Sequence, residues 1–469
     1  MLFRPSFLVA IAPRLVKAPV PGGRDFCGMK LSMNMTRTRR TALVWLLLCC
    51  GISAFWGYIL ASASPAGMLD FKAVYYGSRC LIQQSDPYLE SEFLRVYQAE
   101  GGEFPSDPTQ SGLFRRAVLV CINLPTALLL VAPFTILAWG PAHILWLLST
   151  AGMVILAAFL MCDIGSKYAS SVSLLLICIL LANCERVVFL GNAAGIVMCL
   201  CVVAVWCFLE ERFVPAGILC LAISLAFKPQ GAGLIWLYFL LAGGVYRKRA
   251  LQTLLVTAVL AIPAILWVTH IAPHWIAELH ANLSAASAHG GINEPGPASL
   301  TGRTPGMVID LQAAISVFWS DPRIYNVVSY LICGVLLLVG AARTLKSRFS
   351  LPGAWLALAA IAAISLLPVY HRQYDAKLLL LTVPACAMLW AEGGLIGWIA
   401  LLLNTAGIVV TGDIPSAILL ILTRNLSLSP EGFAGKILTV LLLEPAPLIL
   451  LAMGIFYLWV YLRREPERG

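Results

Sequence analysis

Four short polar clusters interrupt long apolar stretches of the sequence, and each contains side chains that can do chemistry. Charged groups beside apolar segments are energetically costly, so they are the first candidates for function. The first cluster centres on Asp70, which precedes an apolar helical stripe that includes Phe71 and Tyr75. A carboxylate at this position can act as a general base, or it can cap the helix that begins here. The sequence leaves both interpretations open.

The second cluster surrounds Asp86, which is followed by Pro87 and Tyr88. An aspartate directly before a proline is typical of the start of a helix, and a further apolar stripe follows it. The pattern therefore favours a structural cap at Asp86.

The third cluster is Lys228 with Pro229, in the middle of the apolar stretch from 213 to 246. Proline breaks a helix and frees backbone groups, which membrane proteins tolerate where the break lines a polar cavity. A lysine in such a cavity suits an anionic phosphate. A plain loop between two short spans is the alternative.

The fourth cluster runs from Tyr370 to Asp375 between two apolar segments and contains His371 and Arg372. Together these residue types can supply a proton acceptor, an anion clamp and an orienting carboxylate. An ordinary solvated loop between helices is the competing interpretation.

The chain as a whole is too apolar for a soluble protein. Of its 469 residues, 60% are hydrophobic and 12% are charged, too few charges to cover a soluble surface. The net charge of +9 arises from short basic clusters between apolar runs, which orient membrane proteins, so we expect no nucleic-acid partner. The 14 cysteines show no zinc-type spacing, and no phosphate loop or dinucleotide fingerprint occurs, so we expect no metal and no cofactor.

Apolar stretches of about 20 residues recur along the chain, and each can cross a bilayer as a helix. We therefore predict an all-α integral membrane protein with about 12 to 13 apolar helices. Thirteen crossings would place the two ends of the chain on opposite sides of the membrane. If both ends lie in the cytoplasm, one short segment between 170 and 246 therefore does not cross the bilayer. The predicted segments are 41–61, 117–138, 141–162, 170–184, 193–209, 213–227, 230–246, 251–271, 323–342, 351–368, 376–391, 394–411 and 436–462.

The basic clusters predict the orientation of these segments. Residues 1–40 are expected to form a cytoplasmic segment, 41–462 one multi-span domain, and 463–469 a basic cytoplasmic tail. The polar stretch 62–116 then forms a structured first external loop, and 272–320 forms a second. The fourth polar cluster falls on the same external side.

In their order and spacing, the polar clusters resemble glycosyltransferase family 87, the polyprenyl-phosphate-mannose-dependent members of the C-type membrane glycosyltransferases. The likeness runs from about residue 41 to 391, although Gly191-Asn192 stands where the family often has Gly-Gln. The matching pieces are Asp70-Phe71 with Tyr75-Tyr76, Asp86-Pro87-Tyr88, Asn123-Leu124-Pro125, Gly191-Asn192-Ala193, Phe227-Lys228-Pro229 and His371 to Asp375.

The resemblance implies a C-type fold that moves a hexose, expected to be mannose, from a polyprenyl-phosphate donor to a lipid or glycan acceptor, with inversion. The active site would lie on the extracytoplasmic face of an inner or plasma membrane, among membrane lipids. A catalytic aspartate is carried over onto Asp70 and a histidine onto His371. We expect the donor phosphate to be bound by Lys228, Arg372 and Arg79, without a metal. The supporting residues are Tyr75, Tyr76, Asp86, Tyr88, Asn192, Tyr374 and Asp375.

The main alternative is a multi-span transporter or lipid flippase, which also needs many spans and a few buried charges. Such a protein should show internal repeats and charges spread through the middle of its spans. The sequence shows no such repeat, and its charged residues gather at the predicted external ends of the spans.

Overall fold

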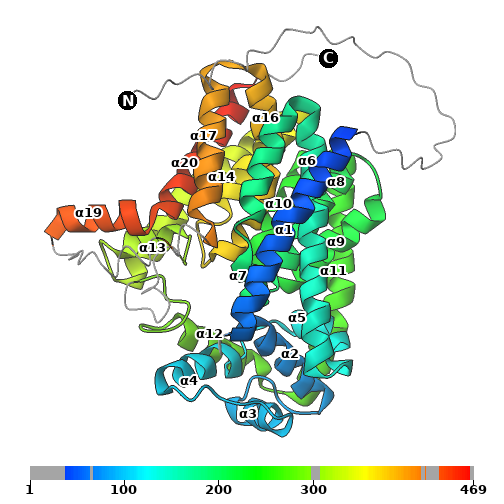
Figure 1. Cartoon of the computed structure of the whole chain (residues 1–469), viewed down its shortest axis with the longest axis vertical. Coiled ribbons are helices and arrows are strands. Elements are labelled where there is room, and N and C mark those ends of the chain that lie inside the picture. The colour runs from blue at the N-terminus through cyan, green and yellow to red at the C-terminus, as the bar shows by residue number, and fades with distance from the viewer. Residues whose placement is uncertain (1–36, 64–66, 297–306, 414–417, 419–431, 465–469) are drawn as a thin grey trace, which may run out of the picture.

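The computed structural model describes residues 37–63, 67–296, 307–413, 418 and 432–464 (Figure 1). Within these ranges the chain is helical, and the only extended pairing is a single bridge between Val308 and Arg372. Six described helices are long and apolar enough to cross a membrane, and seven shorter apolar helices accompany them. The predicted all-α multi-span fold is confirmed. Most of the predicted segments 1–40 and 463–469 lies outside the described residues.

The described helices fall into two groups, apolar helices and connecting helices. The apolar helices are α1 (Arg37–Ala63), α5 (Pro125–Val131), α6 (Trp139–Leu181), α8 (Ala194–Leu209), α9 (Val214–Phe227), α10 (Pro229–Ala242), α11 (Gly244–Ile271), α14 (Pro322–Lys346), α15 (Leu351–Ile364), α16 (Thr382–Glu392), α17 (Gly394–Val410), α19 (Gly432–Leu443) and α20 (Pro445–Arg463). The connecting helices are α2 (Leu69–Ile82), α3 (Glu90–Ala99), α4 (Pro108–Phe114), α7 (Glu185–Leu190), α12 (Trp275–Ser287) and α13 (Leu311–Ser316). Three irregular helices are η1 (Arg115–Leu119), η2 (Ala132–Ile136) and η3 (Gln373–Leu381).

Several of the predicted segments are divided differently in the structure. The predicted segment 117–138 is shared among η1, α5 and η2. The predicted segments 141–162 and 170–184 form one helix, α6, which is kinked at Ala169 (φ −148°, ψ 94°). The predicted segment 436–462 is instead divided between α19 and α20, because Pro445 begins a new helix.

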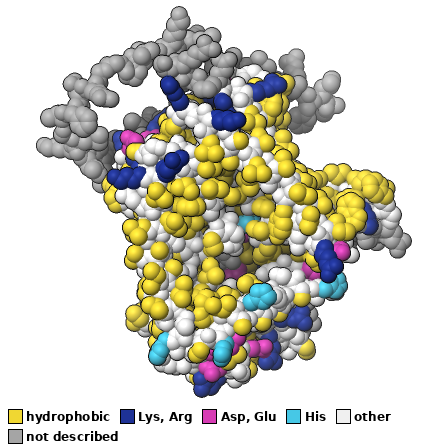
Figure 2. Space-filling model, turned by 180° about the vertical axis from the view of Figure 1, so that it is seen from behind, with side chains coloured by type: hydrophobic (Ala, Val, Ile, Leu, Met, Phe, Trp, Pro, Cys, Tyr) yellow, Lys and Arg dark blue, Asp and Glu magenta, His cyan; other side chains and the backbone are white. Residues whose placement is uncertain are grey.

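The polar stretch 62–116 is folded, as predicted, and contains α2, α3 and α4. These helices lie beside α12 at one end of the bundle, whereas the start of α1 and the turn between α16 and α17 lie at the other (Figure 1). Many Lys and Arg side chains gather at that other end (Figure 2). The molecule therefore has a basic end and, opposite to it, an end built from the connecting helices.

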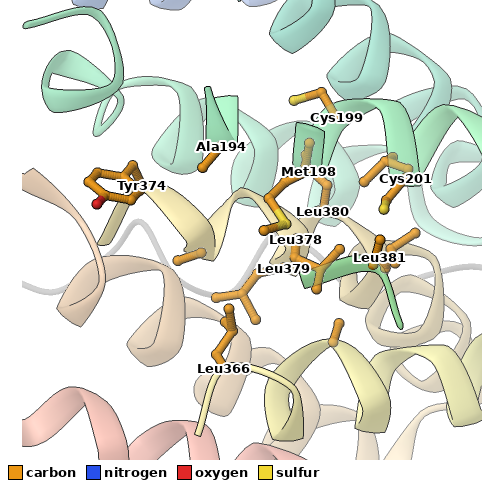
Figure 3. Close-up of a cluster of buried hydrophobic side chains, with 14 of the residues drawn as sticks. Ala194, Met198, Cys199, Cys201, Leu366, Tyr374, Leu378, Leu379, Leu380 and Leu381 are labelled. Carbon is orange, nitrogen blue, oxygen red and sulfur yellow. The ribbon is translucent and has the colours of Figure 1, made fainter. Parts of the chain in front are cut away.

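An apolar core fixes η3 against α8. Ala194 and Met198 of α8 face Leu378 and Leu379 of η3, and all four side chains are buried (Figure 3). Burial of such side chains is worth about 1.5 to 3 kcal/mol for each large residue. The polar residues that begin η3 are therefore carried on a well-packed support.

Candidate active site

Asp70 is the second residue of α2, and its carboxylate is held from outside that helix. The cap position is Met68, whose side chain makes no capping hydrogen bond. Met68 has φ 59°, a left-handed conformation that is costly for a residue with a side chain, and its N–H donates to Phe189 O at 2.7 Å. Asp70 Oδ2 accepts a hydrogen bond from Asn192 Nδ2 at 2.7 Å. The capping interpretation of Asp70 therefore does not describe its position.

The turn between α7 and α8 brings Asn192 to Asp70. Gly191 ends α7 with φ 62°, and a Cβ atom there would lie 2.9 Å from Phe71 Cβ. Only glycine therefore lets this turn approach α2 so closely. Asn192 Oδ1 accepts from Ala194 N at 2.8 Å, which turns the amide so that its Nδ2 faces the carboxylate.

The helix break predicted at Lys228 is present and places the lysine in the same region. Lys228 stands between α9 and α10 with φ −144° and ψ 77°. Its Nζ forms an ion pair with Asp375 and lies 5.4 Å from the centre of the Tyr374 ring. The lysine side chain is 18% exposed whereas that of Asp375 is 1% exposed, so the lysine is the accessible member of the pair.

Asp375 contacts the side chain of Lys228 and the backbone of Arg372. One oxygen binds Lys228, and the other accepts from Arg372 N at 3.1 Å. Arg372 Nη2 donates to Ile292 O at 2.9 Å, and its guanidinium lies 5.3 Å from the centre of the Tyr370 ring. The buried Asp375 carboxylate therefore holds the ammonium of Lys228 and the backbone that carries Arg372, whereas the Ile292 carbonyl holds the guanidinium.

His371 is fully buried and presents one ring nitrogen without a partner. Its Nδ1 lies 2.8 Å from Val369 O, a carbonyl that can only accept, so Nδ1 carries the proton and Nε2 has the lone pair. Within the described part of the chain Nε2 has no hydrogen-bond partner. Burial lowers the pKa of His371 below its ordinary value, an effect that Asp375 opposes. The imidazole is therefore a neutral acceptor at neutral pH.

Asp310 holds the loop that carries His371, and the sequence analysis missed it. Its Oδ1 accepts from Ala313 N at 2.9 Å and so caps α13, while its Oδ2 accepts from His371 N at 3.4 Å. Burial raises the pKa of Asp310 to about 7. An aspartate directly before an apolar helical run is a capping signal, so the first of these contacts was open to prediction.

A second polar group that the sequence analysis missed supports the far side of η3. Arg186 Nη1 donates to Gln373 Oε1 at 2.6 Å, and its backbone N–H donates to Asp413 Oδ2 at 2.7 Å. Burial raises the pKa of the neighbouring Glu185 to about 7. Adjacent charges between two apolar segments were the available signal.

The electrostatic surroundings of Asp70 make it a stronger proton acceptor than an ordinary carboxylate. Burial raises the pKa of Asp70, and Arg372, Asn192 and Lys228 oppose that effect. Proton acceptors work best when their pKa lies nearer to the working pH. The structure thus brings together Asp70, one amide and two cations from four separate segments.

Arg79 does not join the other two cations. It lies at the far end of α2, nine residues or about 14 Å along the helix from Asp70. There it forms an ion pair with Glu100 and donates from Nη1 to Thr135 O at 2.6 Å.

The predicted aromatic residues of α2 pack this helix onto α6. Tyr75 OH donates to Leu137 O at 2.8 Å, and the Tyr76 ring stacks on Trp139 with 5.8 Å between the centroids. Both tyrosines are buried and position α2.

Asp86 and Tyr88 form a turn of their own. Asp86 Oδ1 accepts from Tyr88 N at 2.8 Å, and Tyr88 OH donates to Asn123 O at 2.9 Å. The expected helix start at Asp86 is wrong, because α3 begins only at Glu90. The aspartate instead closes the turn that leads to this helix.

The surface of the molecule is hollowed on one face, and histidine and acidic side chains are visible inside the hollow between mostly hydrophobic walls (Figure 2). Within the residues that the structure describes, no group of three or more His, Cys, Asp or Glu side chains could hold a metal ion.

The family model of glycosyltransferase family 87 matches residues 122–367, which is more than half of the chain. No curated protein and no solved structure matches the chain. The matched range includes Asn192, Lys228 and Asp310, but it begins after Asp70 and ends before His371.

Proposed function

Because the chain belongs to glycosyltransferase family 87, we propose that it transfers a hexose, with mannose as the expected sugar, from a polyprenyl phosphate to a lipid or glycan acceptor. The protein is a multi-pass membrane glycosyltransferase. A polyprenyl-phosphate donor stays in the bilayer, which suits a polar site between apolar helices.

The observation that carries this proposal is the placement of Asp70. Asn192 binds its carboxylate at 2.7 Å, and Lys228 and Arg372 lie within electrostatic range of it. This arrangement combines a proton acceptor with two cations that suit a phosphate. It supports a reaction in which an acceptor hydroxyl displaces a phosphate from a sugar.

In the proposed step, the Asp70 carboxylate takes the proton of the acceptor hydroxyl. At the same time, the oxygen of that hydroxyl forms a bond to the anomeric carbon. The bond from that carbon to the phosphate oxygen breaks, and polyprenyl phosphate leaves with the electron pair. Direct displacement inverts the configuration at the anomeric carbon, which develops oxocarbenium character during the step. Lys228 and Arg372 neutralise the charge that grows on the leaving phosphate.

His371 has a different part in the proposal. Its Nε2 is a buried acceptor without a partner among the described residues, and such an atom costs about 1 to 3 kcal/mol until it is satisfied. Lys228 and Asp375 are its electrostatic neighbours, whereas Asn192 is the residue that orients Asp70. We therefore assign Nε2 to a donor sugar hydroxyl, beside the phosphate.

The extracytoplasmic position of the site is part of the proposal. Asn282 Nδ2 donates to Tyr88 O at 3.0 Å, and Arg372 Nη2 donates to Ile292 O at 2.9 Å. These contacts link the three polar segments that the sequence analysis expects outside the cell. The gathering of Lys and Arg at the opposite end supports a cytoplasmic assignment for that end (Figure 2).

A panel of labelled donors tests the reaction. Purified protein is incubated with polyprenyl-phosphate mannose, polyprenyl-phosphate glucose and a nucleotide-activated mannose, each with a membrane lipid extract as acceptor. We expect transfer from polyprenyl-phosphate mannose and none from the nucleotide sugar. Transfer from the nucleotide sugar alone would overturn the proposed donor.

Chelation tests the role given to the two cations. Because Lys228 and Arg372 neutralise a monophosphate leaving group, we expect the transfer rate to survive EDTA. A rate that falls with EDTA and returns with a divalent ion would transfer that role to a metal.

A further inference from the structure

Two adjoining cavities lie between α10, α14, α15 and α20. The first is lined almost entirely by apolar side chains, among them Leu237, Leu337, Ile361 and Leu458. The second is lined by three arginines and several hydroxyl side chains, together with a few apolar residues.

The two cavities adjoin each other and lie away from the candidate active site. They share three lining residues, Tyr238, Thr344 and Tyr461. Tyr238 is ten residues, or about 15 Å along α10, beyond Lys228. The polar cavity includes Ser350, the residue that caps the start of α15, while His371 follows the opposite end of that helix. A ligand here is therefore not the donor that the proposed reaction uses.

The polar cavity is strongly positive. Arg343, Arg348 and Arg464 line it, and no carboxylate is among the described residues that do so. Glu392 partly neutralises Arg464 in an ion pair, so the positive charge of the cavity comes mainly from Arg343 and Arg348. The Nε of Arg343 is buried and has no hydrogen-bond partner within the described ranges. A buried guanidinium nitrogen in this state favours an anionic ligand.

The start of α15 adds to this preference. Ser350 caps the helix by accepting from Gly353 N, and both Gly353 and Ala354 line the polar cavity. The amino end of a helix carries a partial positive charge and binds phosphate groups. Hydroxyl groups complete the lining, since Ser347 Oγ lies 3.4 Å from Tyr461 OH.

We propose that the two cavities together bind one anionic phospholipid, with its phosphate in the basic cavity and an acyl chain in the apolar cavity. A free phosphate would leave the apolar cavity unexplained, and a neutral lipid would leave the arginines unexplained. Arg464 pairs with Glu392 at the end of α16, and Arg343 Nη2 donates to Arg464 O, so these arginines lie at the basic end of the molecule (Figure 1). Basic pockets between helices on the cytoplasmic side of membrane proteins bind anionic headgroups.

Native mass spectrometry of the full-length protein tests this site. The protein is purified in detergent and mixed with phosphatidylglycerol or phosphatidylcholine of identical acyl chains. We expect phosphatidylglycerol to be retained about tenfold better. The double variant Arg343→Gln with Arg348→Gln should abolish this preference, whereas Arg212→Gln with Lys248→Gln should preserve it. The control residues are exposed cations outside both cavities.

The acyl chain needs an independent test. Ala341 lines the apolar cavity, so Ala341→Phe should fill it and reduce lipid retention with the arginines intact; Ala341→Leu is the milder variant if the first does not fold. Glycerophosphoglycerol, which has the headgroup without acyl chains, should compete poorly. Equal retention of the two lipids, or unchanged retention in both the arginine and the Ala341 variants, would overturn the proposal. Full competition by glycerophosphoglycerol would show a phosphate site and not a lipid site.

Discussion

Asp70 and Asp86 belong to the same folded stretch of polar sequence, yet their carboxylates are held in opposite ways. Asp86 Oδ1 accepts from the backbone of Tyr88, two residues away. Asp70 Oδ2 accepts from the side chain of Asn192, at a sequence separation of 122 residues. A local bond of the first kind stabilises a turn.

The long-range contact of Asp70 has no such local purpose. To form it, α2 starts at a left-handed Met68 and the turn at Gly191 approaches without room for a side chain. Strained or closely packed backbone of this kind tends to occur at functional sites. The comparison therefore indicates that Asp86 stabilises a local turn, whereas the surrounding helices hold Asp70 in a defined position.

The largest expected effect separates these two aspartates directly. Asn accepts hydrogen bonds nearly as well as Asp but cannot take a proton, so Asp70→Asn should lower the transfer rate by about 10² to 10⁴. Asp86→Asn should keep most of the rate. Both variants are measured in the same vesicles, with folding checked by thermal unfolding. Similar rates in the two folded variants would end the distinction.

The next effect compares two cations, Lys228 at the break between α9 and α10 and Arg79 on α2. Lys228→Ala should lower kcat/KM for the donor by about 10- to 1,000-fold, because the leaving phosphate loses one positive charge. Arg79→Ala should leave this value within about twofold, since Arg79 pairs with Glu100 at the far end of α2.

A folding control is needed for the lysine, since its removal leaves Asp375 buried without its ion partner. The double variant Lys228→Met with Asp375→Asn removes both charges. It should recover thermal stability without recovering donor use. Recovery of donor use in this variant would exclude Lys228 from phosphate binding.

A smaller effect is expected at Asn192, which orients the base and does not react. Asn192→Ala should lower kcat by about tenfold while the donor KM changes little, because the lost bond is one neutral-to-charged hydrogen bond. Asn192→Asp should be worse, since it places a second negative charge beside Asp70. If instead the donor KM rises and kcat holds, Asn192 contacts the donor and does not orient the base.

A different kind of effect, on stability and not on the transfer rate, is expected at Asp310. Burial raises the pKa of Asp310 to about 7 in the folded protein, against about 4 in an unfolded chain. The folded state then holds a proton that the unfolded state has lost, so stability falls as pH rises from about 4 to about 7 and levels off above. Thermal unfolding in detergent should show this fall, and Asp310→Asn should reduce it. An equal fall in the variant would assign it to another group.

The sequence was sufficient for the helical membrane fold and for the break at Lys228, because apolar length and proline act locally. It failed where polar residues sit on a continuing helix, as in α6, where the segment after Asp163 resembles a loop. The sequence analysis also grouped Arg79 with Lys228 and Arg372. Only the structure shows that Arg79 lies at the far end of α2, where it pairs with Glu100.

The main residues of the candidate site were predictable from the sequence, but the contacts between them were not. Asp70, Lys228 and His371 were each singled out, whereas the contact of Asp310 with the backbone of His371 joins residues 61 positions apart. Such contacts depend on the packing of whole helices, as with η3 on α8 (Figure 3). The catalytic roles themselves remain predictions.

The pH dependence of the transfer rate tests most directly the claim that the Asp70 carboxylate takes the proton. Activity should fall with decreasing pH through the pKa of Asp70, and because burial raises that pKa, the midpoint should lie above the ordinary value of about 4. His371, whose pKa burial lowers, is replaced by Gln in a parallel sample. We predict that the acidic limb persists in His371→Gln and is absent from the residual activity of Asp70→Asn. An acidic limb that persists in Asp70→Asn and disappears in His371→Gln would contradict the account and assign the base to His371.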